Sequence, residues 1–340
     1  MTNNAGNRPL ALTLGEPAGI GPDITLLAWS RREELKLPPF YLLGDREFLE
    51  RRAKALGLKV GLAEVGPDEA SAAFAKALPV VATGELATAR PGQPDASSAN
   101  AALASIRQAV ADVQSGQASA VVTNPIAKSV LYQAGFRHPG HTEFLAELAA
   151  TDGKAPLLPV MMLWSPLLAV VPVTIHLSLR EAINQLSTGL IVGTTRIVAA
   201  GLHKSFGLAR PRLALSGLNP HAGEDGSFGT EDKTIVAPAI DILRAEGLDV
   251  RGPLPADTMF HEAARKTYDC AICMYHDQAL IPIKTLAFDD GVNVTLGLPF
   301  VRTSPDHGTA FDIAGSGRAN PASLVAALRL ADRMAAATSR

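Results

Sequence analysis

The stretch AICMYHDQALIPIK, residues 271–284, begins as an apolar run and meets its first basic and acidic side chains at His276 and Asp277. A short aliphatic run of this kind is typical of a buried strand whose two faces are both covered. In open parallel sheets, binding sites form beyond the carboxyl ends of the strands. His276 and Asp277 therefore either face a site or simply reach solvent.

Similar runs recur along the chain and alternate with longer amphipathic segments rich in alanine and leucine. Strands are predicted at residues 10–14, 40–44, 118–123, 159–164, 168–175, 212–217, 270–275 and 292–297. Helices are predicted at residues 45–57, 97–116, 141–150, 178–187, 189–207 and 321–338, several beginning at Ser, Thr or Asp and ending at Gly. This alternation predicts parallel strands with crossover helices, and 340 residues suit two α/β/α domains.

Composition narrows the class of protein. Hydrophobic residues make up 47% of the chain and charged residues 19%, which allows an extensive core and excludes global disorder. The chain carries 31 Lys and Arg against 33 Asp and Glu, without a basic block, so nucleic acid is not an expected partner. The N-terminus lacks the basic and apolar regions of a signal peptide, and a cytoplasmic protein is expected.

Two apolar features have alternative interpretations. Residues 157–177 are long and hydrophobic enough to raise the question of a membrane helix, but three prolines interrupt them. Two buried strands joined by a turn at 164–166 are predicted instead. Cys270 and Cys273, the only cysteines, form a CxxC string; on a strand this spacing favours two buried small hydrophobes over a redox or zinc pair.

Histidines follow three different predicted strands, at His176, His221 and His276. Three imidazoles with an open position form a divalent-metal site that polarises a hydroxyl or carbonyl group. Spacing alone leaves separate structural roles equally open. Asp277 beside His276, and Asp257 in the loop PLPADT, each suit ligand orientation, metal binding or proton transfer, or else a helix cap or surface carboxylate.

Loops with binding chemistry lie nearby in the sequence. NPHAGEDGSFGTED, residues 219–232, has three glycines and five acidic or amide side chains, which suits a loop that wraps a ligand better than a plain connection. GHTEF places His141 and Thr142 at a helix start that favours anions, although capping by Thr142 is the competing explanation. Lys284 and Arg302 add positive charge. GEPAGIGPD, residues 15–23, matches neither common nucleotide fingerprint.

DHGTAFDIAGSGRANP, residues 306–321, resembles the loop that grips the adenosine of NAD(P) in isocitrate and isopropylmalate dehydrogenases. Together with GEPAGIGPD, GHTEF, GLNPHAGE, PLPADT, MYHDQ and GVNVTLGLPFVRTSPDHGTA, it makes residues 9–335 similar to the 4-hydroxythreonine-4-phosphate dehydrogenase family of pyridoxal phosphate biosynthesis. One departure is TNPIAKS, where Asn124 replaces a glycine common in that family while Lys128 is retained.

The resemblance implies an isocitrate/isopropylmalate dehydrogenase-like fold with the active site in the interdomain cleft. Residues 1–124 with 295–340 would form the nucleotide-binding domain, and residues 125–294 the metal, substrate and dimerisation domain. It implies a homodimer with active sites at the subunit interface, each metal being bound by His176, His221 and His276 from both subunits.

Further site residues are implied by the same resemblance. Substrate would be bound by His141, Thr142, Lys284, Asn293 and Arg302. NAD or NADP would contact His307, Gly308, Thr309, Asp312 and Ile313. The candidates for proton transfer are Asp257, Asp277 and Lys284.

The implied reaction is the oxidation of 4-phosphooxy-L-threonine by NAD(P) with one Zn, Mg or Co ion per site. The 2-amino-3-oxo-4-phosphooxybutanoate formed would lose CO₂ to give 3-amino-2-oxopropyl phosphate, a step toward pyridoxine 5'-phosphate. Close paralogues oxidise other phosphorylated hydroxy acids such as threonate 4-phosphate. A metal hydrolase using the same histidines, and an acyl-transfer or non-catalytic protein on the related phosphate acetyltransferase fold, are the rival hypotheses.

Overall fold

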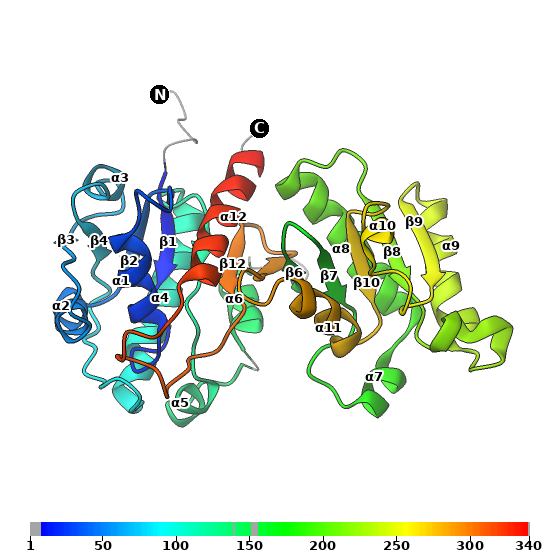
Figure 1. The fold of residues 1–340 in the computed structure, drawn as a ribbon, viewed down its shortest axis with the longest axis horizontal. Helices are drawn as coiled ribbons and strands as arrows, with labels where there is room; N and C mark the ends of the chain where they lie inside the picture. Colours follow the sequence, from blue (N-terminus) through cyan, green and yellow to red (C-terminus); the bar gives the residue numbers. More distant parts are fainter. Residues whose placement is uncertain (1–7, 139, 151–155, 339–340) are drawn as a thin grey trace. The chain divides into compact units, whose positions relative to one another are not determined.

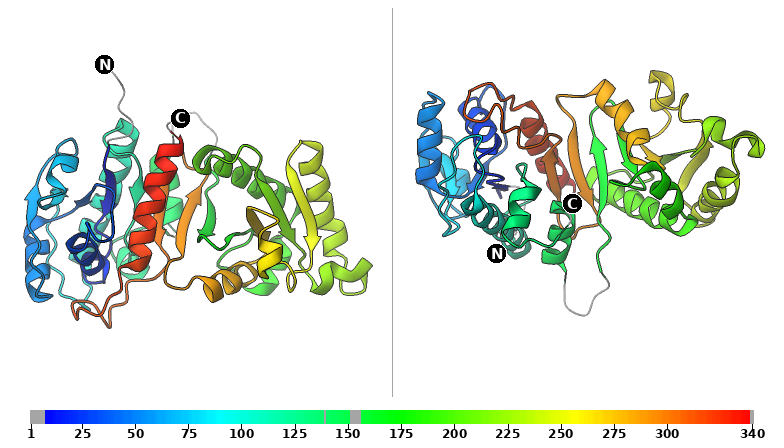
Figure 2. Two further views of the ribbon diagram at one scale, coloured as in Figure 1. Left: turned by 45° about the horizontal axis from the view of Figure 1, so that its top comes forward. Right: turned by 90° about the horizontal axis from the view of Figure 1, so that it is seen from below.

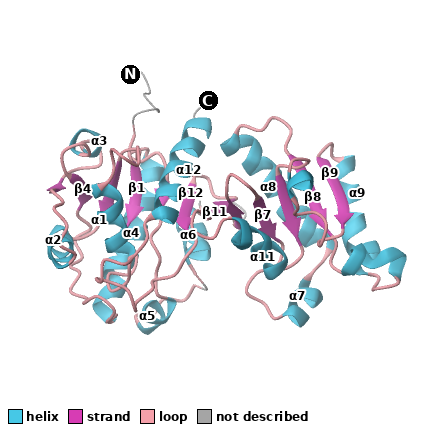
Figure 3. Ribbon diagram, viewed as in Figure 1, coloured by secondary structure: helices cyan, strands magenta, loops and turns pink. Residues whose placement is uncertain are grey.

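The computed structural model describes residues 8–138, 140–150 and 156–338 (Figure 1). The chain forms two compact units: unit 1 is Met1–Pro159 with Leu298–Arg340, and unit 2 is Val160–Gly297. Each unit contains a run of six neighbouring strands with helices on both faces (Figures 2 and 3), so the predicted α/β class is confirmed.

The sheet of unit 1 has the strand order β3-β4-β2-β1-β5-β12, and all its neighbouring strands are parallel. Strands β1, β5 and β12 are therefore neighbours whose carboxyl ends lie on one edge of the sheet. The bounds are β1 Leu10–Thr13, β2 Phe40–Leu43, β3 Leu62–Glu64, β4 Leu78–Val81, β5 Val121–Val122 and β12 Arg302–Pro305.

Helices α1 and α12 cover one face of this sheet and α4 covers the other (Figure 2). Asp45 caps α2 by accepting hydrogen bonds from Glu47 N at 2.9 Å and Phe48 N at 3.3 Å, as an N-terminal Asp predicts. The bounds are α1 Gly21–Ser30, α2 Arg46–Ala55, α3 Ala70–Ala73, α4 Ala96–Ser115, α5 Lys128–Gln133, α6 His141–Ala149 and α12 Ala322–Thr338.

The sheet of unit 2 has the order β11-β6-β7-β10-β8-β9. Strands β7, β10, β8 and β9 are parallel, whereas β6 is antiparallel to both of its neighbours. The reversal follows from the short Ser165 turn between β6 and β7. The bounds are β6 Val160–Trp164, β7 Ala169–Pro172, β8 Arg212–Ser216, β9 Asp249–Leu254, β10 Cys270–Cys273 and β11 Val292–Leu296.

Helix α11 covers one face of the unit 2 sheet, and α8 and α9 cover the other (Figure 2). Helix α8 begins with the cap Ser187 and ends at Gly207, whose φ of 70° is left-handed, as the sequence predicts. The bounds are α7 Leu179–Gln185, α8 Thr188–Phe206, the 3₁₀ segment η2 Pro220–Gly226, the π-helical turn η3 Asp232–Val236, α9 Ala237–Ala245, α10 Glu262–Arg265 and α11 His276–Leu286.

The division of the chain differs from the predicted one, which placed the first boundary after residue 124. Residues 125–159 belong to unit 1, because α5 and α6 share a hydrophobic core with α4. Leu131 and Phe144 from these helices pack with Ile106 of α4. The second boundary, at residues 297 and 298, lies close to the predicted 294 and 295.

The two apolar features resolve as predicted. Residues 160–172 form two strands joined by a turn in which Ser165 N donates to Leu168 O at 2.9 Å. Within the described ranges, no helix is both long enough and apolar enough to cross a membrane. Cys270 and Cys273 are buried free thiols, and burial raises the pKa of both.

Candidate active site

Three adjacent parallel strands of unit 2, β7, β10 and β8, each lead into a histidine-bearing segment. His176 follows β7, His276 follows β10, and His221 follows β8. Parallel neighbours end at the same edge of a sheet, so these segments begin side by side. The order of strands in the sheet is thus what makes the sequence prediction of a shared site physically possible.

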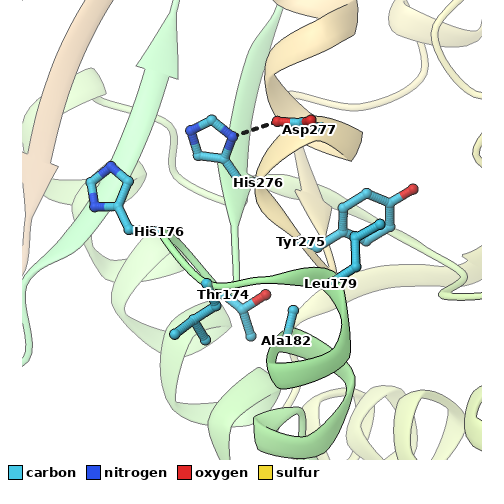
Figure 4. A pocket seen from close by; sticks show the side chains of 8 residues that line it. Thr174, His176, Leu179, Ala182, Tyr275, His276 and Asp277 are labelled. Carbon is cyan, nitrogen blue, oxygen red and sulfur yellow. Dashed lines mark hydrogen bonds and ion pairs between the residues drawn. The ribbon is translucent and has the colours of Figure 1, made fainter.

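His176 and His276 lie together beside a pocket at this edge (Figure 4), their ring centroids 5.8 Å apart. His176 has a left-handed backbone with φ of 53°, an uncommon conformation for a non-glycine residue. The pocket is lined by Thr174, His176, Leu177, Leu179, Ala182, Tyr275, His276 and Asp277. Two of the three predicted metal ligands are therefore neighbours.

Asp277 lies on the side of the His276 ring away from His176 (Figure 4), with its Oδ1 2.6 Å from His276 Nδ1. A carboxylate in this position favours a proton on Nδ1 and leaves Nε2 as the nitrogen with a free lone pair. A histidine oriented in this way suits a metal ligand. Both side chains belong to the first turn of α11, which fixes their spacing.

His221 occupies a left-handed turn that follows β8. Residues 221–225 have φ values of 53°, 54°, 81°, 39° and 54°, although only Gly223 among them is a glycine. The His221 ring lies 6.0 Å from that of Phe228, and its side chain is exposed. Among the residues that the structure describes, no group of three His, Cys, Asp or Glu side chains is placed to hold a metal ion.

Asp232, the first residue of η3, holds this turn in place. Its buried carboxylate accepts hydrogen bonds from Leu218 N at 2.6 Å, Asn219 N at 3.0 Å and Asn219 Nδ2 at 3.0 Å. Gly217 leaves room for this packing, since a Cβ there would lie 2.9 Å from Asp232 Oδ1 and 2.7 Å from Ala222 Cα. The sequence predicted a ligand-wrapping loop here but gave no sign that Asp232 anchors it.

Three predicted site residues of unit 2 lie outside the lining of this pocket. Lys284 is in the last turn of α11, with Nζ 5.6 Å from the Phe288 ring centroid. Asn293 is in β11, opposite Leu163 of β6. Asp257 is exposed in the turn after β9.

A basic cluster forms in unit 1 at the start of α6. Gly140 is the N-cap of this helix and no side chain caps it, so capping by Thr142 is not the role of that residue here. Burial, followed by the positive charges of Arg302 and Lys128, lowers the pKa of His141 well below its usual value. His141 Nε2 is buried without a hydrogen-bond partner among the described residues. The positive charges of Arg302 and Lys128 and the neutral imidazole of His141 together suit the binding of an anionic ligand.

Arg302 and Lys128 approach this helix start from different elements. Arg302 begins β12, is 3% exposed, and donates to Thr123 Oγ1 at 2.6 Å. Burial lowers its pKa to about 10, so it remains charged at neutral pH. Lys128 begins α5, with Nζ 3.4 Å from the position a Cβ would take on Gly140. Sequence reasoning noted Lys128 only within TNPIAKS; its place just beyond β5 was the available signal.

Asn124, the departure in TNPIAKS, joins two strand ends of unit 1. Its buried Nδ2 donates to Thr13 O and to Thr25 Oγ1, both at 3.0 Å. The side chain therefore ties the segment that follows β5 to β1 and to α1. It stabilises the segment that leads to Lys128 and leaves the histidines of unit 2 untouched.

The candidate cofactor loop, residues 306–317, packs on the GEPAGIGPD segment. Thr309 O accepts from Ile20 N at 2.9 Å, and Asp23 Oδ2 accepts from Gly315 N at 2.6 Å. Asp23 also forms a buried ion pair with Arg52 of α2 at 2.5 Å. His307 Nε2 is buried with no hydrogen-bond partner in the described part of the chain, which leaves a polar atom for a ligand. These features fit the binding of a polar cofactor.

Comparisons with known proteins identify the family of the chain. The family model described as "Pyridoxal phosphate biosynthetic protein PdxA" matches residues 36–331. The 4-hydroxythreonine-4-phosphate dehydrogenases of Bradyrhizobium diazoefficiens and Methylorubrum populi are 74% and 66% identical to the chain. These alignments cover 99% of both chains in the first case, and 97% of this chain and 95% of the relative in the second.

Among solved structures, the crystal structure of 4-hydroxythreonine-4-phosphate dehydrogenase from Klebsiella pneumoniae has a TM-score of 0.85 and 38% sequence identity. The match covers 98% of this chain and 99% of that one. The resemblance carried by the sequence motifs is thereby confirmed over nearly the whole length. The chain belongs to the PdxA family of pyridoxal phosphate biosynthetic proteins.

Proposed function

We propose that the chain oxidises 4-phosphooxy-L-threonine with NAD or NADP and a divalent cation, and that the product decarboxylates to 3-amino-2-oxopropyl phosphate. The chain is an oxidoreductase by its family, since its relatives at 74% and 66% identity are named 4-hydroxythreonine-4-phosphate dehydrogenase. The observation that carries the proposal is the pair of histidines, His176 and His276, at adjacent strand ends with Asp277 orienting one of them.

His176, His221 and His276 are proposed as the metal ligands. A cation bound there would polarise the substrate oxygen atoms and stabilise negative charge on them. Asp277 supports this by holding the Nδ1 proton of His276, so that Nε2 points its lone pair outward. Imidazole nitrogens suit Zn²⁺ and Co²⁺, with Mg²⁺ as a further candidate.

Substrate is proposed to bind His141, Thr142, Lys284, Asn293 and Arg302. The charge of Arg302 and the neutral state of His141 support the recognition of a phosphorylated, carboxylated molecule, because one supplies a permanent cation and the other a ring nitrogen for hydrogen bonding. A phosphate held away from the reacting carbon supplies binding energy that orients it.

The cofactor is proposed to bind His307, Gly308, Thr309, Asp312 and Ile313. When bound, its nicotinamide supplies the hydride acceptor. The anchoring of this loop on residues 15–23 supports the assignment, because the loop keeps its shape through contacts within unit 1. Asp257, Asp277 and Lys284 are proposed for proton transfer, with Asp277 acting on His276.

We further propose a homodimer in which each metal site takes histidines from both subunits. The support is that His176 and His276 are neighbours within one chain, whereas His221 joins no metal-competent group among the described residues. A partner subunit supplies the missing ligand in this arrangement.

The test is absorbance of NADH or NADPH formed from 4-phosphooxy-L-threonine, run beside threonate 4-phosphate. Turnover is expected with the first substrate, loss of turnover with a chelator, and recovery with Zn²⁺, Co²⁺ or Mg²⁺. His276→Ala is expected to lose at least 100-fold in kcat/KM. Unchanged turnover by this variant in chelator contradicts the metal mechanism. Preference for threonate 4-phosphate reassigns the substrate, and phosphoester hydrolysis without NAD(P) supports a hydrolase.

A further inference from the structure

A buried glutamine connects the ends of the strands that carry the three histidines. Gln278 lies in the first turn of α11, two residues after His276, and is 9% exposed. Its Oε1 accepts from Met274 N at 2.7 Å and from Ser216 Oγ at 2.7 Å. Its Nε2 donates to Gly217 O at 2.8 Å. One side chain therefore binds the end of β10 and the end of β8.

The third strand end joins the same network through the backbone of Met274. Thr174 Oγ1, buried two residues before His176, donates to Met274 O at 2.8 Å. The Met274 carbonyl thus accepts a hydrogen bond from Thr174, and the Met274 N–H donates one to Gln278. The network runs from the segment of His176, through that of His276, to Gly217, where the His221 turn begins.

The Gly217 end of the network continues into the anchor of the His221 turn. Leu218 N and Asn219 N, the next two backbone donors after Gly217, bind the Asp232 carboxylate. Gln278 of α11 and Asp232 of η3 bind the two ends of the same peptide group, Gly217 O and Leu218 N, and Asp232 also binds the next N–H. Hydrogen bonds from α11 and from η3 therefore fix the path of the chain from β8 to His221.

We propose that Gln278 is a positioning residue that sets the relative placement of the three histidine-bearing segments; this rests on the metal site proposed above. An amide suits this place because it offers a strong acceptor and a donor on one planar group. Glutamate lacks the donor for Gly217 O, and methionine lacks both functions. The hydrogen bonds of Gln278 described above go to Met274, Ser216 and Gly217, so its effect on the histidines passes through the backbone.

The test is the affinity of metal-free enzyme for Co²⁺, followed by the visible absorption of the bound ion. Gln278→Met is expected to bind Co²⁺ about 10-fold more weakly or worse, as seen when groups supporting metal ligands are removed. Saturating Co²⁺ is expected to restore most of its kcat. The matched control is Gln185→Met, an exposed position at the end of α7, which is expected to bind Co²⁺ as the wild type does.

Gln278→Glu keeps the acceptor for Met274 N and Ser216 Oγ and replaces the donor to Gly217 O with a carboxylate oxygen, so it tests the β8 side of the network separately. The glutamate variant also tests the proposal if the methionine variant fails to fold. A folded Gln278→Met or Gln278→Glu protein with wild-type Co²⁺ affinity and spectrum overturns the proposal. His276→Ala is measured alongside: if it too keeps wild-type affinity, the metal site itself is wrong, whereas its loss of affinity confines the failure to Gln278.

Discussion

His141 shows how surroundings change the chemistry of a single residue. Burial and the charges of Arg302 and Lys128 place its pKa well below the usual 6.5. Below pH 6.5 the unfolded chain takes up a proton at this residue and the folded chain does not. Stability is therefore undiminished above pH 6.5 and falls as the pH drops from 6.5 toward the folded-state pKa.

His141→Asn is expected to remove this loss. Between pH 7.5 and pH 5.5 the wild type should lose unfolding free energy at this site, and the variant should not. Urea unfolding at pH 7.5 and 5.5 measures the difference, with the exposed His203→Asn as control. An equal acid loss in the wild type and in His141→Asn shows that His141 is not held neutral.

Among single residues, the sequence could predict those site residues that directly follow a strand. His176, His276 and Asp277 follow predicted strands, and the structure places them together. Lys128 and Gln278 were not assigned roles, because each depends on packing between elements that are distant in sequence: Lys128 on α6, and Gln278 on β8. Sequence periodicity carries no information on such contacts.

The turn after β8 is an element whose conformation opposes local preference. His221, Ala222, Glu224 and Asp225 all have left-handed backbones, and each such residue costs about 1 kcal/mol or more. Propensity predicts glycine at such positions, so the sequence did not reveal this turn. The hydrogen bonds to Asp232 offset part of that cost.

Asp232→Asn is expected to lower the unfolding free energy by about 1–3 kcal/mol, since its amide cannot accept at both former oxygens from the buried N–H groups. It should also weaken Co²⁺ binding by displacing His221. Denaturant unfolding and Co²⁺ titration measure both effects, and the exposed Asp241→Asn in α9 is the control. Wild-type stability in the folded variant would show that the turn needs no such anchor.

At the scale of the whole molecule, the layered α/β fold was predictable because it follows from hydrophobic patterning. The antiparallel pairing of β6 with β7 follows from the predicted turn at 164–166. The placement of residues 125–159 in unit 1 was not predictable, because it depends on packing against α4. Strands β3, β4, β9 and β12 were also missed. Arg302–Pro305, the sequence of β12, is polar and ends in proline, so only its neighbours make it a strand.

Mixed subunits test the proposed dimer. A preparation containing only His221→Ala, or only His276→Ala, is expected to be inactive. If each site takes histidines 221 and 276 from different subunits, unfolding and refolding the two variants together should give hybrids with one intact site, and up to about a quarter of wild-type activity overall. If both histidines come from one chain, no activity returns. Refolded wild type is the control for recovery.

The anchoring of residues 306–317 has a thermodynamic consequence for whatever ligand they bind. Asp23, already paired with Arg52, accepts from Gly315 N, and Ile20 N holds Thr309 O. The conformational entropy of ordering these residues is lost during folding, and association need not remove it again. Ligand binding at this loop should therefore carry only a small unfavourable entropy of ordering the chain. The heat-capacity change of binding should reflect only the surface that the ligand covers.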